Sequence, residues 1–170
     1  MSNLLFSPQG RILKNRFWQG LVVLTVATVI FTALPVYLGP MWGMLSLLLI
    51  YPYICVYAKR FHDAGTTGWW VIAVWLGALV LSMIEGMLFG SFFLGEEGRA
   101  IQEEAAERLA QGEFQVFVEA QERLNQRMLP LSIASSIVNN VILGYIVGML
   151  KTQPVQNKHG PVPGEEWQDF

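Results

Sequence analysis

The sequence predicts an all-α membrane protein with four transmembrane helices and an extracytoplasmic amphipathic helical loop between the third and fourth. Of its 170 residues, 53% are hydrophobic and only 14% are charged, whereas about 25% of residues are charged in ordinary soluble domains. The charged residues are also segregated, so that long stretches carry none. A net charge of −2 without a basic stripe argues against a nucleic-acid partner.

Four segments are apolar enough to cross a hydrocarbon core, which takes about 20 helical residues. The predicted spans, which form one domain, cover residues 17–38, 41–58, 69–94 and 128–150. None of them alternates polar and apolar residues as barrel strands do, so helices are expected. Pro40 lies in the connection between the first and second spans. Pro35 and Pro52 lie inside spans, where neighbouring helices can satisfy the carbonyls that proline leaves free.

Lysine and arginine residues predict the orientation of these spans in the bilayer. Three segments hold these residues: Arg11, Lys14 and Arg16 before the first span, Lys59 and Arg60 after the second, and Lys151 and Lys158 in the tail 151–170. These segments are expected in the cytoplasm, together with both termini. The connection from Gly95 to Arg127 holds four Arg and eight Glu and is expected outside.

The outer loop, residues 96–127, is predicted to be helical because it lacks proline and is rich in good helix formers. Ile101, Ala105 and Leu109 recur every four residues, and a second apolar pattern begins after Gly112. We therefore expect two amphipathic helices, the second leading into the fourth span. Their apolar faces either pack on each other, lie in the headgroup layer, or bind a second copy of the chain or a membrane or periplasmic protein.

Few polar residues occur inside the predicted spans. Glu85 is the one ionisable group, and it lies roughly 24 Å along the third span, near the outer interface. A carboxylate that reaches water is the main interpretation, and a proton or cation site is the alternative. Asn139 and Asn140 lie near the middle of the fourth span, where asparagine can donate hydrogen bonds to a neighbouring helix.

Small residues recur every four positions in two spans. The fourth span has Ser132, Ser136, Asn140, Gly144 and Gly148, and the third has Ala78, Ser82, Gly86 and Gly90. Small residues on one face let helices approach closely, so the third and fourth spans are expected to pack tightly along these strips.

The connection between the second and third spans holds the densest set of polar residues. Gly65 and Gly68 fit a tight turn, Thr67 is a candidate N-cap, and Trp69 and Trp70 anchor the next span at the interface.

His62 and Asp63 suggest catalysis at first sight, but adjacent residues of a helix do not face each other. We expect instead that Asp63 pairs with Arg60, Arg11 or backbone N–H groups, while the segment from Asn157 to Pro163, which includes Gly160, crosses the helix ends as an extended strap. The alternative is that Arg11 and Arg60 only set the topology by facing lipid phosphates. Cys55 is the single cysteine, and no ligand spacing for a metal occurs, so no metal or cofactor is expected.

Three of these stretches resemble one known family. The run Arg60 to Gly65, followed by Gly68 to Trp70, resembles the R-L-H-D-x-G-R-S-G-W-W signature of Domain of Unknown Function 805, a family of small bacterial inner-membrane proteins. Gly10 to Trp18 is similar to its G-R-x-x-R-x-x-[FY]-W opening, and Asn157 to Pro163 to its closing G-x-N-[RK]-[YF]-G-x-x-P. The resemblance implies an inner-membrane location and supplies no activity.

A non-enzymatic scaffold or partner-binding module in the lipid bilayer is the function that the sequence favours, since it lacks a recognisable catalytic set. The alternative is a small oligomeric transporter or channel component that uses Glu85, Asn139 and Asn140. An enzyme using His62 and Asp63 is the third hypothesis.

Overall fold

The computed structural model describes residues 2–163, in which helices are the only regular elements apart from one antiparallel bridge between Asn157 and Gly160. Four helical segments are long and apolar enough to cross a membrane: Lys14–Leu38, Pro40–Asp63, Gly68–Ala110 and Phe114–Gly148. The predicted all-helical class with four long apolar helices is therefore confirmed. Residues 164–170 of the predicted tail lie outside the described part of the chain.

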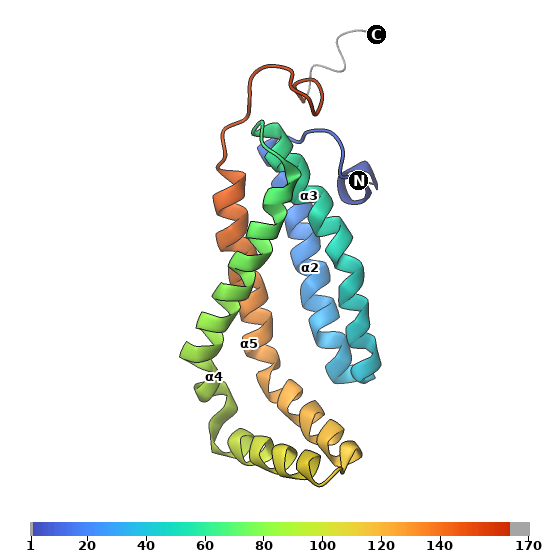
Figure 1. Cartoon of the computed structure of the whole chain (residues 1–170), viewed down its shortest axis with the longest axis vertical. Helices are drawn as coiled ribbons and strands as arrows, with labels where there is room; N and C mark the ends of the chain where they lie inside the picture. Colours follow the sequence, from blue (N-terminus) through green and yellow to red (C-terminus); the bar gives the residue numbers. More distant parts are fainter. Residues whose placement is uncertain (1, 164–170) are drawn as a thin grey trace.

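Seven helical elements make up the fold, in the order α1 (Ser2–Phe6), α2 (Lys14–Leu38), the 3₁₀ helix η1 (Pro40–Leu49), α3 (Ile50–Asp63), the 3₁₀ turn η2 (Gly68–Trp70), α4 (Val71–Ala110) and α5 (Phe114–Gly148). Figure 1 shows α1, the end of α3 and the segment after α5 together at one end of the bundle, which we call the cap end. The middle of the long α4–α5 stretch lies at the opposite end.

The core of the bundle lies in the half nearest the cap end. Helix α5 packs against both α4 and α2, and α3 packs against α2. Buried apolar side chains from all four helices meet there, among them Phe17, Leu21, Leu24, Val56, Tyr57, Val74 and Val147. The rings of Phe17 and Tyr57 meet edge to face at 5.4 Å, a favourable geometry for aromatic pairs.

The second apolar segment differs from the prediction in two ways. The sequence placed its end at residue 58, but α3 continues to Asp63, so Lys59 and Arg60 are helical and not part of a connection. Its first half is the 3₁₀ helix η1, and Pro52 consequently lies in the first turn of α3, where a helix tolerates a missing N–H.

Helix α4 breaks at Gly95, whose φ of 64° and ψ of −171° lie outside the helical region. The chain then runs across the end of the bundle opposite the cap end, reverses at Gly112 with a φ of 81°, and returns as the first part of α5. We call residues 96–127 the helical arm (Figure 1). Ala105, Ala120 and Leu124 are buried, so the two halves of the arm pack partly on each other.

Only one of the two small-residue strips packs closely. A Cβ added to Gly144 would lie 2.2 Å from Leu21 Cδ2, and one on Gly148 would lie 3.2 Å from the ring of Trp18. Gly86 and Gly90 have no such neighbour within 4 Å among the described residues. The expectation of close packing at Gly86 and Gly90 is therefore wrong within the single chain, because α4 and α5 diverge toward the arm (Figure 1). The partner of the α5 strip is α2.

Gly144 and Gly86 give a matched pair of substitutions that tests this packing. Gly144→Leu should lower the free energy of unfolding by about 1–3 kcal/mol, because the new side chain overlaps Leu21 in the core. Gly86→Leu introduces the same side chain into open space and should leave stability nearly unchanged. Thermal unfolding in detergent measures both, and equal losses would contradict the assignment of α2 as the partner.

Candidate functional site

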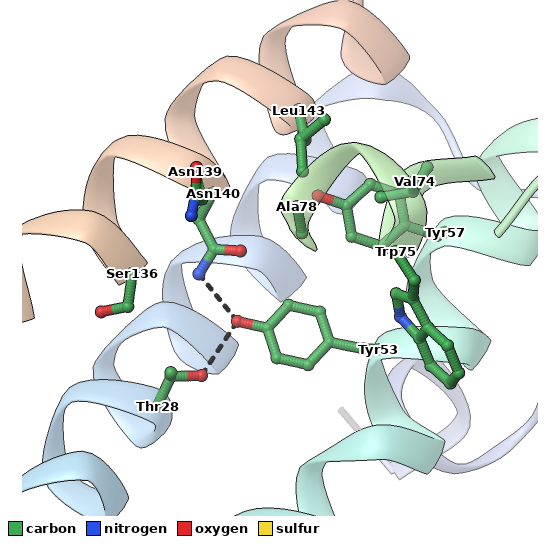
Figure 2. Close-up of a pocket in the computed structure, with 10 residues that line it drawn as sticks. All are labelled: Thr28, Tyr53, Tyr57, Val74, Trp75, Ala78, Ser136, Asn139, Asn140 and Leu143. Atoms are coloured by element: carbon green, nitrogen blue, oxygen red, sulfur yellow. Dashed lines mark hydrogen bonds between the residues drawn. The ribbon is translucent and has the colours of Figure 1, made fainter. Parts of the chain in front are cut away.

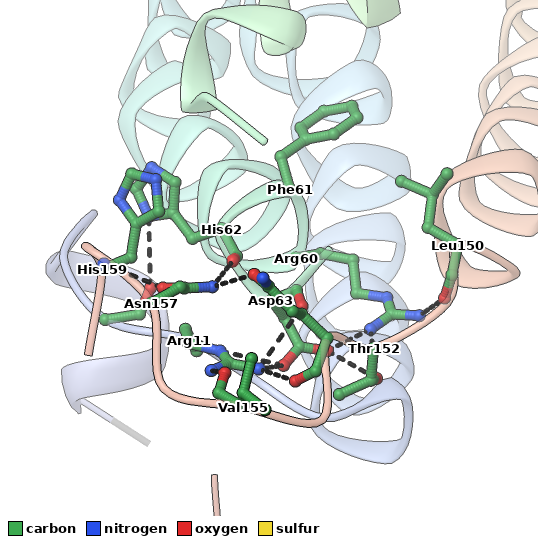
Figure 3. A network of polar contacts seen from close by, with 12 residues as sticks. Arg11, Arg60, Phe61, His62, Asp63, Leu150, Thr152, Val155, Asn157 and His159 are labelled. Carbon is green, nitrogen blue, oxygen red and sulfur yellow. Dashed lines mark hydrogen bonds and ion pairs between the residues drawn. The ribbon is translucent and has the colours of Figure 1, made fainter. Parts of the chain in front are cut away.

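The candidate site is a polar cluster at the cap end, built from three segments that are far apart in the sequence (Figure 3). Arg11 precedes α2, Arg60 and Asp63 lie in the last turn of α3, and residues 150–157 follow α5. We call this assembly the cap. Its residues come from all three stretches that carry sequence motifs, and the fold brings these stretches together at one end of the bundle.

Asp63 lies at the centre of the cap, and its side chain is fully buried. Its Oδ1 pairs with Arg11 Nη2 at 3.2 Å, and its Oδ2 pairs with Arg60 Nη1 at 2.5 Å. The Thr152 hydroxyl donates a further hydrogen bond to Oδ2 at 2.7 Å. Both arginine side chains are 1% exposed, so one carboxylate is shared by two guanidinium groups that water scarcely reaches. Charge-assisted contacts are strongest in such surroundings.

Arg60 also joins α3 to the end of α5. Its Nη2 donates to the Gly148 carbonyl at 3.0 Å and to the Leu150 carbonyl. The last carbonyls of a helix lack partners within the helix and carry the negative end of its dipole. A guanidinium group from α3 therefore supplies the C-terminal cap of α5.

Arg11 holds the segment after α5 in place. Its Nη2 donates to the Gln153 carbonyl at 2.5 Å and its Nη1 to the Val155 carbonyl at 2.9 Å. The Gln153 N–H donates to the Asp63 carbonyl at 2.8 Å. Residues 151–157 thus cross the helix ends as a strap. The sequence placed this strap at residues 157–163, but Asn157 to Gly160 form a turn closed by the bridge between these two residues.

Asn157 fastens the far end of the strap to α3. Its Nδ2 donates to the His62 carbonyl at 3.0 Å, and its Oδ1 accepts from the His159 N–H at 2.8 Å. Its backbone pairs with that of Gly160, whose φ of 133° favours glycine. These contacts explain why an asparagine and a glycine recur at this spacing in the third motif.

His62 faces away from Asp63. Its ring stacks on that of His159, with centroids 3.7 Å apart and planes 7° apart, and its Nδ1 lies 3.2 Å from the Gly10 carbonyl. The side-chain partners of Asp63 are Arg11, Arg60 and Thr152. The two neighbours therefore form no histidine–carboxylate pair, as their adjacency on a helix predicts.

The two glycines of the connection after α3 fit close contacts. Gly65 has a φ of 76°, and a Cβ there would lie 2.4 Å from Gln153 Oε1 of the strap. A Cβ on Gly68 would lie 3.0 Å from both Ala58 Cβ and His62 Nε2. Both positions need glycine because the turn lies directly against the cap.

The start of α4 follows this turn. Thr67 Oγ1 accepts a hydrogen bond from the Trp69 N–H at 3.4 Å, the role expected of an N-cap. Trp69 and Trp70 expose 76% and 55% of their surface, so neither contributes to the core. Two exposed indoles at the end of an apolar helix are typical of an interfacial belt.

The polar residues inside the apolar helices do not form one group. Asn139 Nδ2 donates to Ser82 Oγ on α4 at 2.9 Å. Asn140 Nδ2 instead donates to the Tyr53 hydroxyl on α3 at 2.7 Å (Figure 2). Glu85 is half-buried, and its Oε2 has no hydrogen-bond partner among residues 2–163. It forms no hydrogen bond with Asn139 or Asn140, so hydrogen bonds do not unite the predicted polar set.

A family described as "Protein of unknown function (DUF805)" matches residues 5–161. The chain belongs to this family. No curated protein and no solved structure matches it. The family match extends from α1 through the bridge at Gly160, and therefore includes every residue of the DUF805 cap.

Sequence reasoning missed several polar residues of this DUF805 protein. Thr152 and Gln153 complete the cap, and Tyr53 and Thr28 form hydrogen bonds with each other beside Asn140. One signal was available in advance, since Tyr53 and Tyr57 lie four residues apart inside an apolar segment and so share a helix face. The strap residues carried no such periodic signal.

Asp63→Asn should destabilise this DUF805 protein strongly. The substitution keeps the shape of the side chain but leaves two buried guanidinium groups without a countercharge, which should cost about 3–5 kcal/mol of unfolding free energy. Arg60→Lys should also destabilise the protein, because an ammonium group cannot donate to Asp63 and to the α5 carbonyls in the same fork geometry. Thermal unfolding in detergent is the measurement.

Glu113→Gln is the matched control for this prediction. It removes the same charge from the ion pair between Arg108 and Glu113, whose side chains are both 42% exposed, and should cost less than about 1 kcal/mol. If Asp63→Asn unfolds at the same temperature as Glu113→Gln, the buried carboxylate does not hold the cap together.

Proposed function

We propose that this DUF805 protein is a non-enzymatic scaffold of the bacterial inner membrane that binds a partner protein through its helical arm. Both termini then lie in the cytoplasm and the arm lies outside it. The proposal has three supports: the charges at the two ends of the bundle, the contacts of the cap residues, and the exposed surface of the arm.

Charge favours this orientation. Lys14 and Arg16 lie at the start of α2, and Lys151 and Lys158 lie in the segment after α5. All four are exposed at the cap end. Residues 95–127 hold four Arg and eight Glu. Cytoplasmic segments near membrane spans carry the excess of Lys and Arg, so the cap end is assigned to the cytoplasm.

A structural role explains the cap residues better than catalysis does. Arg11, Arg60 and Asp63 are buried, and their side chains contact one another, Thr152 and backbone carbonyls. A catalytic acid, base or nucleophile has to reach its substrate, and groups engaged in this way do not. The motif residues then serve to assemble the helix ends.

The arm is the observation that carries the partner-binding proposal. Its two halves bury Ala105, Ala120 and Leu124, but at its tip Leu109 and Phe114 remain 47% and 65% exposed. The Phe114 ring lies 6.1 Å from that of Phe117, so an aromatic surface forms beside the turn at Gly112. Aromatic side chains with a polar surround are typical of the centre of protein interfaces.

The second candidate is a small oligomeric transporter or channel component. It is favoured by a cavity beside Asn139 and Asn140. Glu85, the ionisable group of the same hypothesis, does not line that cavity. A pathway for ions would place a charged or titratable side chain next to the polar amides, so the geometry favours the scaffold.

A cysteine at Gln111 tests the orientation. In a Cys55→Ala background, Gln111→Cys should react with a membrane-impermeant thiol reagent in intact spheroplasts, because the exposed turn of the arm lies outside. Lys158→Cys should react only after lysis. The reverse pattern of labelling would invert the proposed topology.

Substitutions at the tip of the arm test partner binding. A protein that co-purifies in constant ratio with the wild type from native membranes should be lost in the double variant Leu109→Ser, Phe114→Ser, because its apolar contact is gone. The double variant Ala106→Ser, Ala110→Ser changes exposed residues of α4, the helix that carries Leu109, and should still co-purify with that protein. Mass spectrometry identifies the partner or a second copy of the chain. Equal recovery with both variants would remove the arm tip from the proposal.

A further inference from the structure

A cavity of about 240 Å³ lies between α2, α3, α4 and α5 (Figure 2). Thr28, Tyr53 and Asn140 line it from three different helices, and Ala78 lines it from the fourth. Tyr53 lies roughly 15 Å along α3 from Asp63, so the cavity is near the middle of a bundle that could cross a membrane. It exceeds the volume of about 150 Å³ in which a dry protein cavity holds benzene.

Part of the polar lining is satisfied by one directed chain of hydrogen bonds. The Thr28 hydroxyl donates to the Leu24 carbonyl at 2.9 Å. It therefore accepts from the Tyr53 hydroxyl at 3.0 Å, and that hydroxyl in turn accepts from Asn140 Nδ2 at 2.7 Å. Each hydroxyl has a single proton, so the direction of the chain is fixed.

Two other polar groups in the lining have no partner. The Tyr57 hydroxyl makes no hydrogen bond with residues 2–163, although Tyr57 is 2% exposed. In Figure 2 it points across the cavity, toward the side where the two asparagines lie. Asn139 is 7% exposed and donates to Ser82, but its Oδ1 is buried without a partner in the described chain. A buried polar atom without a partner is costly, so an occupant that donates to Asn139 Oδ1 is favoured. The Tyr57 hydroxyl is not among the fully buried atoms without partners, and it offers that occupant a second contact.

The lining also defines the chemistry of that occupant. No Asp, Glu, Lys, Arg or His side chain among the described residues lines the cavity, so a charged ligand would lose its hydration without gaining a countercharge. Asn139 Oδ1 requires a donor, and the Tyr57 hydroxyl can donate or accept. A ligand hydroxyl meets both requirements. The rings of Tyr53 and Tyr57 lie 6.3 Å apart at 21°, and with Trp75 they present flat apolar faces.

We propose that this cavity binds an uncharged aromatic alcohol, with the ring against Tyr53 and Trp75 and the hydroxyl between Tyr57 and Asn139. Trp75 is 41% exposed, so the lining reaches the outer surface of the bundle. A lipid-soluble ring compound enters from there without passing the cap. The site is separate from the helical arm, so its occupancy does not depend on partner binding.

The probes 4-fluorophenol and 4-fluoroanisole test the proposal on the full chain in nanodiscs, with ¹⁹F NMR against empty nanodiscs as the readout. They share the ring and differ in the hydroxyl donor. The wild type should bind the phenol saturably and about tenfold more tightly than the anisole, the effect of one or two neutral hydrogen bonds. Equal affinities, or partition no greater than into empty nanodiscs, would mean that water alone fills the cavity and would overturn the proposal.

Tyr57→Phe is the decisive variant because it removes an unpartnered hydroxyl and breaks no hydrogen bond of the described chain. It should weaken phenol binding about five- to tenfold, and anisole binding as well, because the ligand oxygen of either probe accepts from the Tyr57 hydroxyl. Tyr145→Phe, on an exposed tyrosine outside the cavity, should have no effect. Ala78→Leu fills the cavity and should abolish binding of both probes. A Tyr57→Phe protein that binds the phenol as tightly as Tyr145→Phe does would contradict the assignment.

Discussion

The fold depends on one buried carboxylate. Asp63 is the only acid in contact with Arg11 and Arg60 among the described residues. All three residues lie in segments that carry sequence motifs. The excess positive charge is met by the partial negative charges of backbone carbonyls at Gly148, Val155 and Gln153. Removing the carboxylate would leave two cations in a site with little water, whereas removing any one carbonyl contact would not. Asp63 therefore links the end of α3 to Arg11, which precedes α2, and to Thr152, which follows α5.

Joining the helices at one end determines how they pack elsewhere. Close contacts such as that of Gly144 with Leu21 occur in the half near the cap. Toward the arm α4 and α5 separate, Gly86 and Gly90 lose their neighbours, and the chain can break at Gly95 without disturbing the core. Arg127, which pairs with Glu97 at 2.7 Å, then stabilises the base of the arm with a contact of its own. The cap and the arm are thus built from separate sets of interactions.

The sequence predicts the helices and the ion pairs of the cap, because hydropathy and motif position carry that information. It does not predict which helices become neighbours. The spacing of Gly144 and Gly148 defines a face of α5, but whether that face meets α2 or α4 depends on the rotation of each helix in the bundle. The link between Tyr53, Thr28 and Asn140 depends on three such rotations at once, so no local pattern indicates it.

Helix α3 connects the two polar regions of the molecule. Tyr53, Tyr57 and Arg60 recur at spacings of four and three, so one stripe of α3 faces the cavity and then the cap. Moving α3 away from α5 to open a path through the bundle would pull Arg60 from the Gly148 carbonyl and separate it from Thr152. A transporter that rocks these helices would have to break buried charge-assisted hydrogen bonds in every cycle. In a scaffold α3 stays fixed, so these hydrogen bonds remain intact and both the cap and the cavity keep their shape.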